Sequence, residues 1–193
     1  MKFIRNALNG LMGNFFNRNY YTLIRLILIS AWKKSGKTSF NGWTVSYDNA
    51  RALIGMYNEI IFQEHYKFSS SSTNPVIIDC GSNIGISVLY FKRLFKNAHL
   101  TAVEADPIIA DILRKNLSMN GVRAEVIEKA VWKTSGDQLS FGSKGSDEGS
   151  LFSNENTIFV ESIRLKDLIN EHEHIDLLKI DIEAAEMEVL KDA

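Results

Sequence analysis

A run of small and polar residues follows an apolar segment in VIIDCGSNIGIS, residues 76–87. Asp79, Gly81, Asn83 and Gly85 alternate with other residues directly after what reads as a buried strand. Glycine lets the backbone turn sharply and approach a ligand, and a helix that follows presents free N–H groups. A strand, a turn and a helix in this order predict a ligand site at the carboxyl end of the strand.

An acidic residue on the next predicted strand indicates a nucleoside ligand. Glu104 ends that strand, 23 residues after Gly81, where a carboxylate can accept hydrogen bonds from ribose hydroxyls. The turn does not match the dinucleotide pattern G-x-G-x-x-G, because positions 83 and 84 are Asn and Ile. It also lacks the lysine-serine pair of a phosphate-binding loop. The pattern therefore favours an adenosine-containing cofactor without a bound pyrophosphate.

Three carboxylates near the end of the sequence form a candidate catalytic group. Asp181 follows the last predicted strand, and Glu183 and Glu186 lie on one face of a predicted helix. Such a group can supply a general base for a hydroxyl, or ligands for a divalent cation. In the structural alternative, Asp181 orients the cofactor and the glutamates favour the helix N-terminus. We expect a catalytic role and no bound metal.

Strands and helices that alternate from Pro75 onward must position these residues. Fully apolar strands separated by helices indicate an α/β fold with a parallel sheet covered on both faces. The expected strand order is 3-2-1-4, which would keep the turn after the first strand in the middle of the sheet. A hairpin-like pair, around DQLSFG and TIFVESI, lies between the third and fourth strands. The strands are predicted at 76–80, 100–104, 124–131 and 175–180, and the helices at 86–96, 107–119 and 183–191. Asp106 is the expected N-cap of the second of these helices, with Pro107 at its first position.

The first 74 residues are predicted to form a helical and hairpin extension, and residues 75–193 a cofactor-binding domain. Apolar residues at helical spacing predict an amphipathic helix over residues 3–16. Asn41-Gly42 between two alternating segments predicts a β-hairpin with Trp43, Val45 and Tyr47 on one face. Residues 50–67 read as a further helix, followed by a polar linker.

Charge is divided unevenly along the 193 residues, although the net charge is only −1. Residues 1–47 hold seven basic and no acidic side chains, which predicts an arm that faces a membrane surface or an acidic substrate. Packing of the amphipathic arm on its own domain is the favoured interpretation of residues 3–16, and reversible membrane contact is the alternative. The apolar run YYTLIRLILISAW is too short to span a membrane. A single cysteine, Cys80, fits a reducing cytosol. We expect a cytoplasmic protein with peripheral membrane contact and no nucleic-acid partner.

Five ordered segments resemble those of the FkbM-type S-adenosylmethionine-dependent methyltransferases. They are IIDCGSNIGIS, VEADP, KAVW, IRLKDLI and LLKIDIEAAEMEVLKDA, within a similarity that covers residues 43–193. The resemblance implies a Rossmann-like methyltransferase fold with S-adenosylmethionine as the cofactor. It also implies methyl transfer to a hydroxyl of a sugar, a glycan or a small natural product.

The resemblance further implies which residues would bind the cofactor. Asp79, Gly81, Asn83 and Gly85 would surround its methionine end, with Ser82 in the same turn. Glu104 would bind the ribose beside Ala105, while Lys129, Ala130 and Val131 would lie near the adenine. Asp181 would face the reacting methyl group.

Two departures from the family pattern leave alternatives open. Ala184 replaces the usual glycine, and the sequence stops after the fourth strand, whereas this fold normally continues through three more. We expect a truncated sheet that lacks part of the acceptor pocket and self-associates through its open edge. A non-catalytic nucleoside-binding module is one alternative, and an NAD-dependent oxidoreductase is another, disfavoured by the turn spacing.

Overall fold

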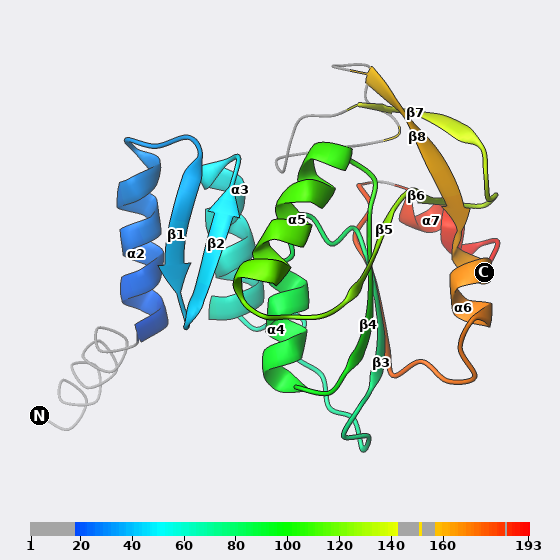
Figure 1. Cartoon of the computed structure of the whole chain (residues 1–193), viewed down its shortest axis with the longest axis horizontal. Helices are drawn as coiled ribbons and strands as arrows, with labels where there is room; N and C mark the ends of the chain where they lie inside the picture. The colour runs from blue at the N-terminus through cyan, green and yellow to red at the C-terminus, as the bar shows by residue number, and fades with distance from the viewer. Residues whose placement is uncertain (1–17, 143–150, 152–156, 184) are drawn as a thin grey trace, which may run out of the picture.

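A four-stranded parallel sheet forms the centre of the computed structural model, which describes residues 18–142, 151, 157–183 and 185–193 (Figure 1). Its order is β5-β4-β3-β9, which confirms the predicted order and the Rossmann-like α/β class. All three pairings are parallel, and four of the five residues of β3 are buried, as its apolar sequence predicts. The strands are β3 (Val76–Cys80), β4 (His99–Glu104), β5 (Glu125–Glu128) and β9 (Leu177–Ile180).

Helices cover the sheet on both sides. Figure 1 shows α4 (Ile86–Leu94) and α5 (Pro107–Met119) on one side, and α6 (Leu165–Asn170) and α7 (Glu186–Leu190) on the other. α5 begins where its cap predicts, because the Asp106 side chain accepts hydrogen bonds from the first turn and proline takes the first helical position.

Two of the helices predicted around the central sheet were too long. The helix predicted over residues 86–96 ends at Leu94. The helix predicted over 183–191 begins only at Glu186, because Glu183 has a φ of +55°. That left-handed conformation cannot continue a right-handed helix.

The third predicted strand, 124–131, is two strands rather than one. β5 belongs to the central sheet, whereas β6 (Ala130–Trp132) pairs in parallel with β8 (Thr157–Arg164). β7 (Gln138–Gly142) pairs with β8 in antiparallel fashion, which confirms the predicted hairpin-like pair. These strands form a second sheet of order β6-β8-β7. Apolar periodicity alone does not reveal that a strand changes its partner midway.

The extension contains one predicted hairpin and one helix that was not predicted. Asn41 and Gly42 both have positive φ, 52° and 86°, as a tight hairpin turn requires, so the hairpin is confirmed. The helix predicted over 50–67 ends early, and its second half is a π-helix. The helix predicted over 3–16 lies outside the described residues. The elements are α2 (Arg18–Ser30), β1 (Gly36–Phe40), β2 (Trp43–Tyr47), α3 (Ala50–Met56) and the π-helix η1 (Tyr57–Phe62).

Two asparagines of α5 attach the hairpin to the domain. The Asn116 amide accepts from the Ser46 N–H at 2.7 Å and donates to its carbonyl at 3.0 Å. Asn120, one helical turn later, makes the same pair with Thr44 at 2.9 and 2.8 Å. The two side-chain amides therefore pair with backbone N–H and C=O groups at the edge of β2, as a neighbouring strand would.

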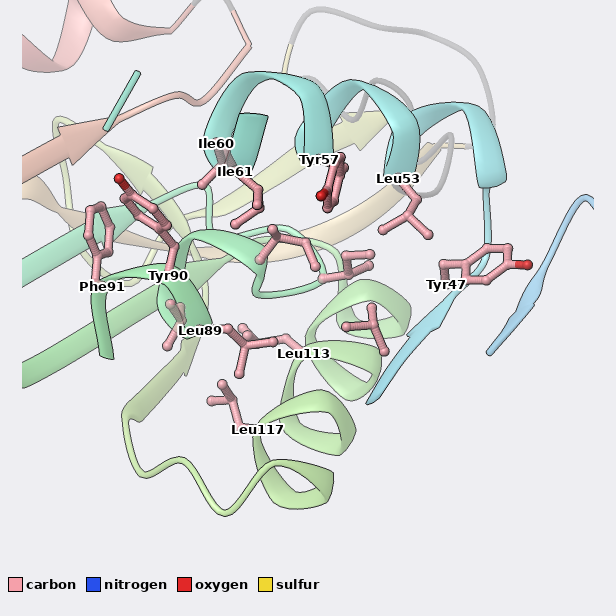
Figure 2. Packing of buried hydrophobic residues seen from close by; sticks show 14 of the residues in the cluster. Tyr47, Leu53, Tyr57, Ile60, Ile61, Leu89, Tyr90, Phe91, Leu113 and Leu117 are labelled. Carbon is pink, nitrogen blue, oxygen red and sulfur yellow. The ribbon is translucent and has the colours of Figure 1, made fainter. Parts of the chain in front are cut away.

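One apolar core joins the extension to the α/β part. Figure 2 shows Leu53 and Tyr57 of the extension in the same cluster as Leu89, Phe91 and Leu113 of α4 and α5. The boundary predicted between residues 74 and 75 does not interrupt this core and stays a prediction. In the part of the chain that the structure describes, β9 has only β3 as a neighbour, and the predicted self-association at this edge also stays a prediction. No helix among the described residues is long and apolar enough to span a membrane.

Candidate active site

A cavity opens at the carboxyl ends of β3, β4 and β9, where parallel α/β sheets bind their ligands. It contains about 930 Å³ of space, part of which is open to solvent. Most of the site residues predicted from the sequence line this cavity. The predicted residues that do not line it are Asp79, Gly85 and Glu186. The predicted residues in its wall are Gly81, Ser82, Asn83, Glu104, Ala105, Lys129, Ala130, Val131, Asp181 and Glu183.

The glycines of the turn after β3 are required by contacts within the protein. Gly81 has a φ of +78°, and a Cβ atom there would lie 1.9 Å from the Asp181 carbonyl oxygen. A Cβ atom at Gly85, φ +88°, would lie 2.4 Å from Cδ1 of Leu113. The turn is thus packed against the end of β9 and against α5. We expected the glycines to admit a ligand, whereas the structure already explains them through protein packing.

Asp79 lies behind the cavity wall and is fully buried. Its Oδ2 accepts a hydrogen bond from the Ser87 hydroxyl at 2.5 Å, and its Oδ1 lies 2.9 Å from Nζ of Lys179. Ser87 and Lys179 both line the cavity. The Asp79 carboxylate therefore reaches the cavity only through these two side chains.

Lys179 is a site residue that the sequence reasoning missed. Its buried ammonium donates to the Gly81 carbonyl at 2.7 Å and the Cys80 carbonyl at 3.3 Å, and ties β9 to the turn after β3. Burial opposes the charge, but Asp79 and Asp181 outweigh it and raise the pKa of Lys179. A lysine inside the otherwise apolar strand LLKI, two residues before Asp181, was the available signal.

Asp181 projects at the mouth of the cavity, with its side chain 54% exposed. Its Oδ2 accepts a hydrogen bond from the Tyr66 hydroxyl at 3.0 Å and lies 3.8 Å from Nζ of Lys179. Burial and the neighbouring Asp181 raise the pKa of Tyr66 above its usual value, so the phenol stays a proton donor. Tyr66 belongs to the segment between η1 and β3, which no sequence motif connected with the site.

Glu104 is buried at the end of β4. Its Oε2 accepts from the Asn83 N–H at 2.8 Å, and its Oε1 accepts from the Asp106 N–H at 2.9 Å. Burial raises the pKa of Glu104 to about 7 even though both hydrogen bonds favour the charged form. The carboxylate faces the cavity with acceptor capacity beyond these two bonds.

The residues predicted near an adenine lie where β5 passes into β6. Ala130 and Val131 are buried there, beside Phe141 and Leu151 in the cavity wall. Lys129 forms an ion pair with Glu161 of β8 at 2.5 Å. This part of the cavity is mainly apolar, as the flat face of a nucleobase prefers.

The three carboxylates of the predicted catalytic group do not gather around one point. Glu183 lines the cavity, whereas Oε1 of Glu186 accepts a hydrogen bond from the Ile182 N–H at 2.9 Å. Glu186 therefore secures the start of α7, as the structural alternative expected, and its catalytic role stays a prediction. The described residues contain no group of three or more His, Cys, Asp or Glu side chains placed to hold a metal ion.

Comparisons with known proteins find methyltransferases. The methyltransferase FkbM domain matches residues 79–193. The methyltransferase sdnD of Sordaria araneosa is 31% identical over 182 residues, covering 70% of this chain and 67% of that protein. Methyltransferase 1 of Beauveria bassiana (strain ARSEF 2860) is 23% identical over 162 residues, covering 70% and 65%. The chain thus spans about two thirds of the length of these relatives.

A solved structure whose name includes FkbM is similar at lower sequence identity. The methyltransferase FkbM crystal structure from Methylobacillus flagellatus KT has a TM-score of 0.46 and 15% identity, and covers 75% of this chain and 39% of that one. The family match itself extends over more than half of the chain, from the turn after β3 onward. The chain belongs to the FkbM methyltransferase domain family.

Proposed function

We propose that this cavity binds S-adenosylmethionine and that the chain transfers the methyl group to a hydroxyl of a sugar, a glycan or a small natural product. The observation that carries the proposal is the buried Glu104 carboxylate, which faces the cavity at the end of β4 beside the turn after β3. Such a carboxylate suits the paired hydroxyls of a ribose. Membership of a methyltransferase family supports methyl transfer as the chemistry.

The wall of the cavity fits each part of such a cofactor. Glu104 and Ala105 would hold the ribose, and the apolar pocket around Val131 would receive the adenine. The turn from Gly81 to Asn83, backed by the Lys179 ammonium, would receive the methionine end.

Bound S-adenosylmethionine would supply a methyl group on a positively charged sulfur, which an oxygen nucleophile can take. The part of the protein is to position the acceptor and to remove its proton. Asp181 is the residue we assign to the proton, because its carboxylate is exposed at the cavity mouth. The hydrogen bond from Tyr66 to Oδ2 would hold that carboxylate in one orientation.

Calorimetry on the intact chain tests the cofactor part of the proposal. We expect S-adenosylhomocysteine to bind and NAD not to bind. Preferential binding of NAD would overturn the proposal in favour of an oxidoreductase.

Turnover with a methyl-labelled cofactor and a panel of hydroxyl acceptors tests the reaction. Asp181→Asn should keep S-adenosylhomocysteine affinity and lose turnover by roughly 10²–10⁴-fold, the usual contribution of a general base. The control is Glu59→Gln, which alters another carboxylate in the wall of the same cavity, outside the predicted catalytic group, and should retain turnover. Cofactor binding without turnover on any acceptor would instead favour a non-catalytic nucleoside-binding module.

A further inference from the structure

α2 packs against α3 and η1, and its opposite face carries exposed apolar side chains. Leu26 is buried on the inner face, while Tyr21, Ile24 and Leu28 recur three and four residues apart on the outer face. Leu28 is 64% exposed, and Trp32 just beyond the helix is 90% exposed. Figure 1 shows α2 at the outer side of the molecule, far from the central sheet. Contiguous apolar surface of this kind marks a contact site rather than a solvated face.

Basic side chains lie within α2 and directly after it. Arg18, Arg25, Lys33, Lys34 and Lys37 are the charged residues between positions 18 and 47, where the sequence has no aspartate or glutamate. A hollow beside the end of α2 is lined by Trp32, Lys33, Lys34 and Arg51, with Asp48 as its one carboxylate. The apolar face therefore continues directly into a cationic surface, which complements a negatively charged partner.

The length of α2 decides how it can meet such a partner. Its 13 residues extend about 20 Å at 1.5 Å per residue, which is too short to cross a bilayer. An apolar face flanked by cations and ended by a tryptophan is typical of a helix that lies in the headgroup region. A second copy of the chain fits less well, since two such surfaces would bring like charges together.

We propose that α2 docks this protein on an anionic lipid membrane. The side chains of Tyr21, Ile24 and Leu28 enter the boundary between headgroups and acyl chains, with Trp32 at the interface. Lys33 and Lys34 contact the lipid phosphates. The docking is reversible, because a short helix without a covalent lipid anchor gives only modest membrane affinity. This inference is independent of the reaction assigned to the cavity.

Cosedimentation of the full chain with phosphatidylcholine vesicles, with and without phosphatidylserine, tests the docking. We expect binding to the anionic vesicles alone, and release of the protein as salt shortens the Debye length. Leu28→Glu and the double variant Lys33→Glu/Lys34→Glu should each weaken binding by at least about tenfold. All substituted side chains are exposed, so the fold is expected to persist, and circular dichroism checks this.

Matched substitutions elsewhere on the surface serve as controls. Phe159→Glu replaces another exposed apolar side chain, and Lys96→Glu/Lys115→Glu reverses two exposed charges outside α2. Both should bind vesicles as the unchanged protein does. Equal loss in the controls, equal binding to neutral vesicles, or no binding by the full chain would overturn the proposal. Light scattering without lipid tests whether the face joins two copies of the chain instead. A dimeric unchanged protein and a monomeric Leu28→Glu variant would overturn the membrane proposal.

Discussion

Glu104 is the residue whose charge state we expect to govern ligand binding. Because its pKa is raised to about 7, it is mostly protonated at pH 6 and mostly charged at pH 8. Ribose hydroxyls donate more strongly to the charged form. We therefore predict that adenosine affinity, measured by calorimetry, rises by about tenfold from pH 6 to pH 8.

Adenosine suits this measurement because it does not titrate in that pH range. Glu104→Gln should bind adenosine more weakly at pH 8 and with no pH dependence. A pH dependence that survives in Glu104→Gln would assign it to another group. The raised pKa of Glu104 also makes the stability of the ligand-free fold depend on pH. The contribution of Glu104 to the free energy of unfolding is fully present at a pH below the ordinary pKa of glutamate. It is lost as the pH rises through about 7.

Lys179 is the residue whose loss should damage the fold most directly. Lys179→Met keeps most of the apolar stem of the side chain but leaves the fully buried Asp79 carboxylate without its ion pair. We predict a loss of about 3–5 kcal/mol in the free energy of unfolding, measured by urea denaturation. Asp79→Asn/Lys179→Met should recover part of that loss, because it removes the unpaired charge. A single variant as stable as the unchanged protein would contradict this account of the pair.

At the scale of elements, the contact between the turn after β3 and the end of β9 is the one that positions the site. Gly81→Ala would place a methyl group 1.9 Å from the Asp181 carbonyl oxygen and force the two segments apart. We predict that the melting temperature falls and that S-adenosylhomocysteine affinity drops in the same variant. Thermal melts and calorimetry measure the two effects.

Gly136→Ala is the matched control for this substitution. Gly136 has a similar φ, +84° against +78°, but no atom lies within 4 Å of the Cβ position. Both variants carry the left-handed backbone cost of about 1–2 kcal/mol, so the difference between them isolates the contact with β9. Equal losses in the two variants would show that backbone conformation, and not the contact, explains the glycine.

For the whole molecule, the continuous core predicts that the extension and the α/β part unfold together. Trp43 reports on the extension and Trp132 on the α/β part, once the other two of the three tryptophans are changed to Phe. We predict coincident urea transitions from the two probes. Separate transitions would instead support independent domains on either side of residue 74.

Leu53→Ala tests the same coupling by mutation. Leu53 is buried in the extension, within the cluster that includes α4 and α5 (Figure 2). We predict a loss of about 2–5 kcal/mol that shifts the Trp132 transition as much as the Trp43 transition. Leu113→Ala, in α5, should likewise shift both. A loss seen only by the nearer probe would contradict a shared core.

Local features of this protein could be predicted from adjacent residues. The hairpin turn at Asn41-Gly42, the cap of α5 at Asp106 and the buried strand β3 all form as predicted. Each depends on the conformational preference of a few neighbours or on a short apolar run. The parallel sheet with helices on both faces followed from the same patterns, because fully apolar strands separated by helices must be covered on both sides.

The partners of the site residues depended on segments far apart in the chain. Tyr66 meets Asp181 across 115 residues, and Lys179 meets the turn after β3 across almost as many. Position 81 must likewise be glycine because of a residue far away in the chain, since a Cβ atom there would collide with the Asp181 carbonyl oxygen. Sequence periodicity records which face of a strand is buried, but which distant side chain lies against it follows only from the packing of the sheet, the turn and the extension.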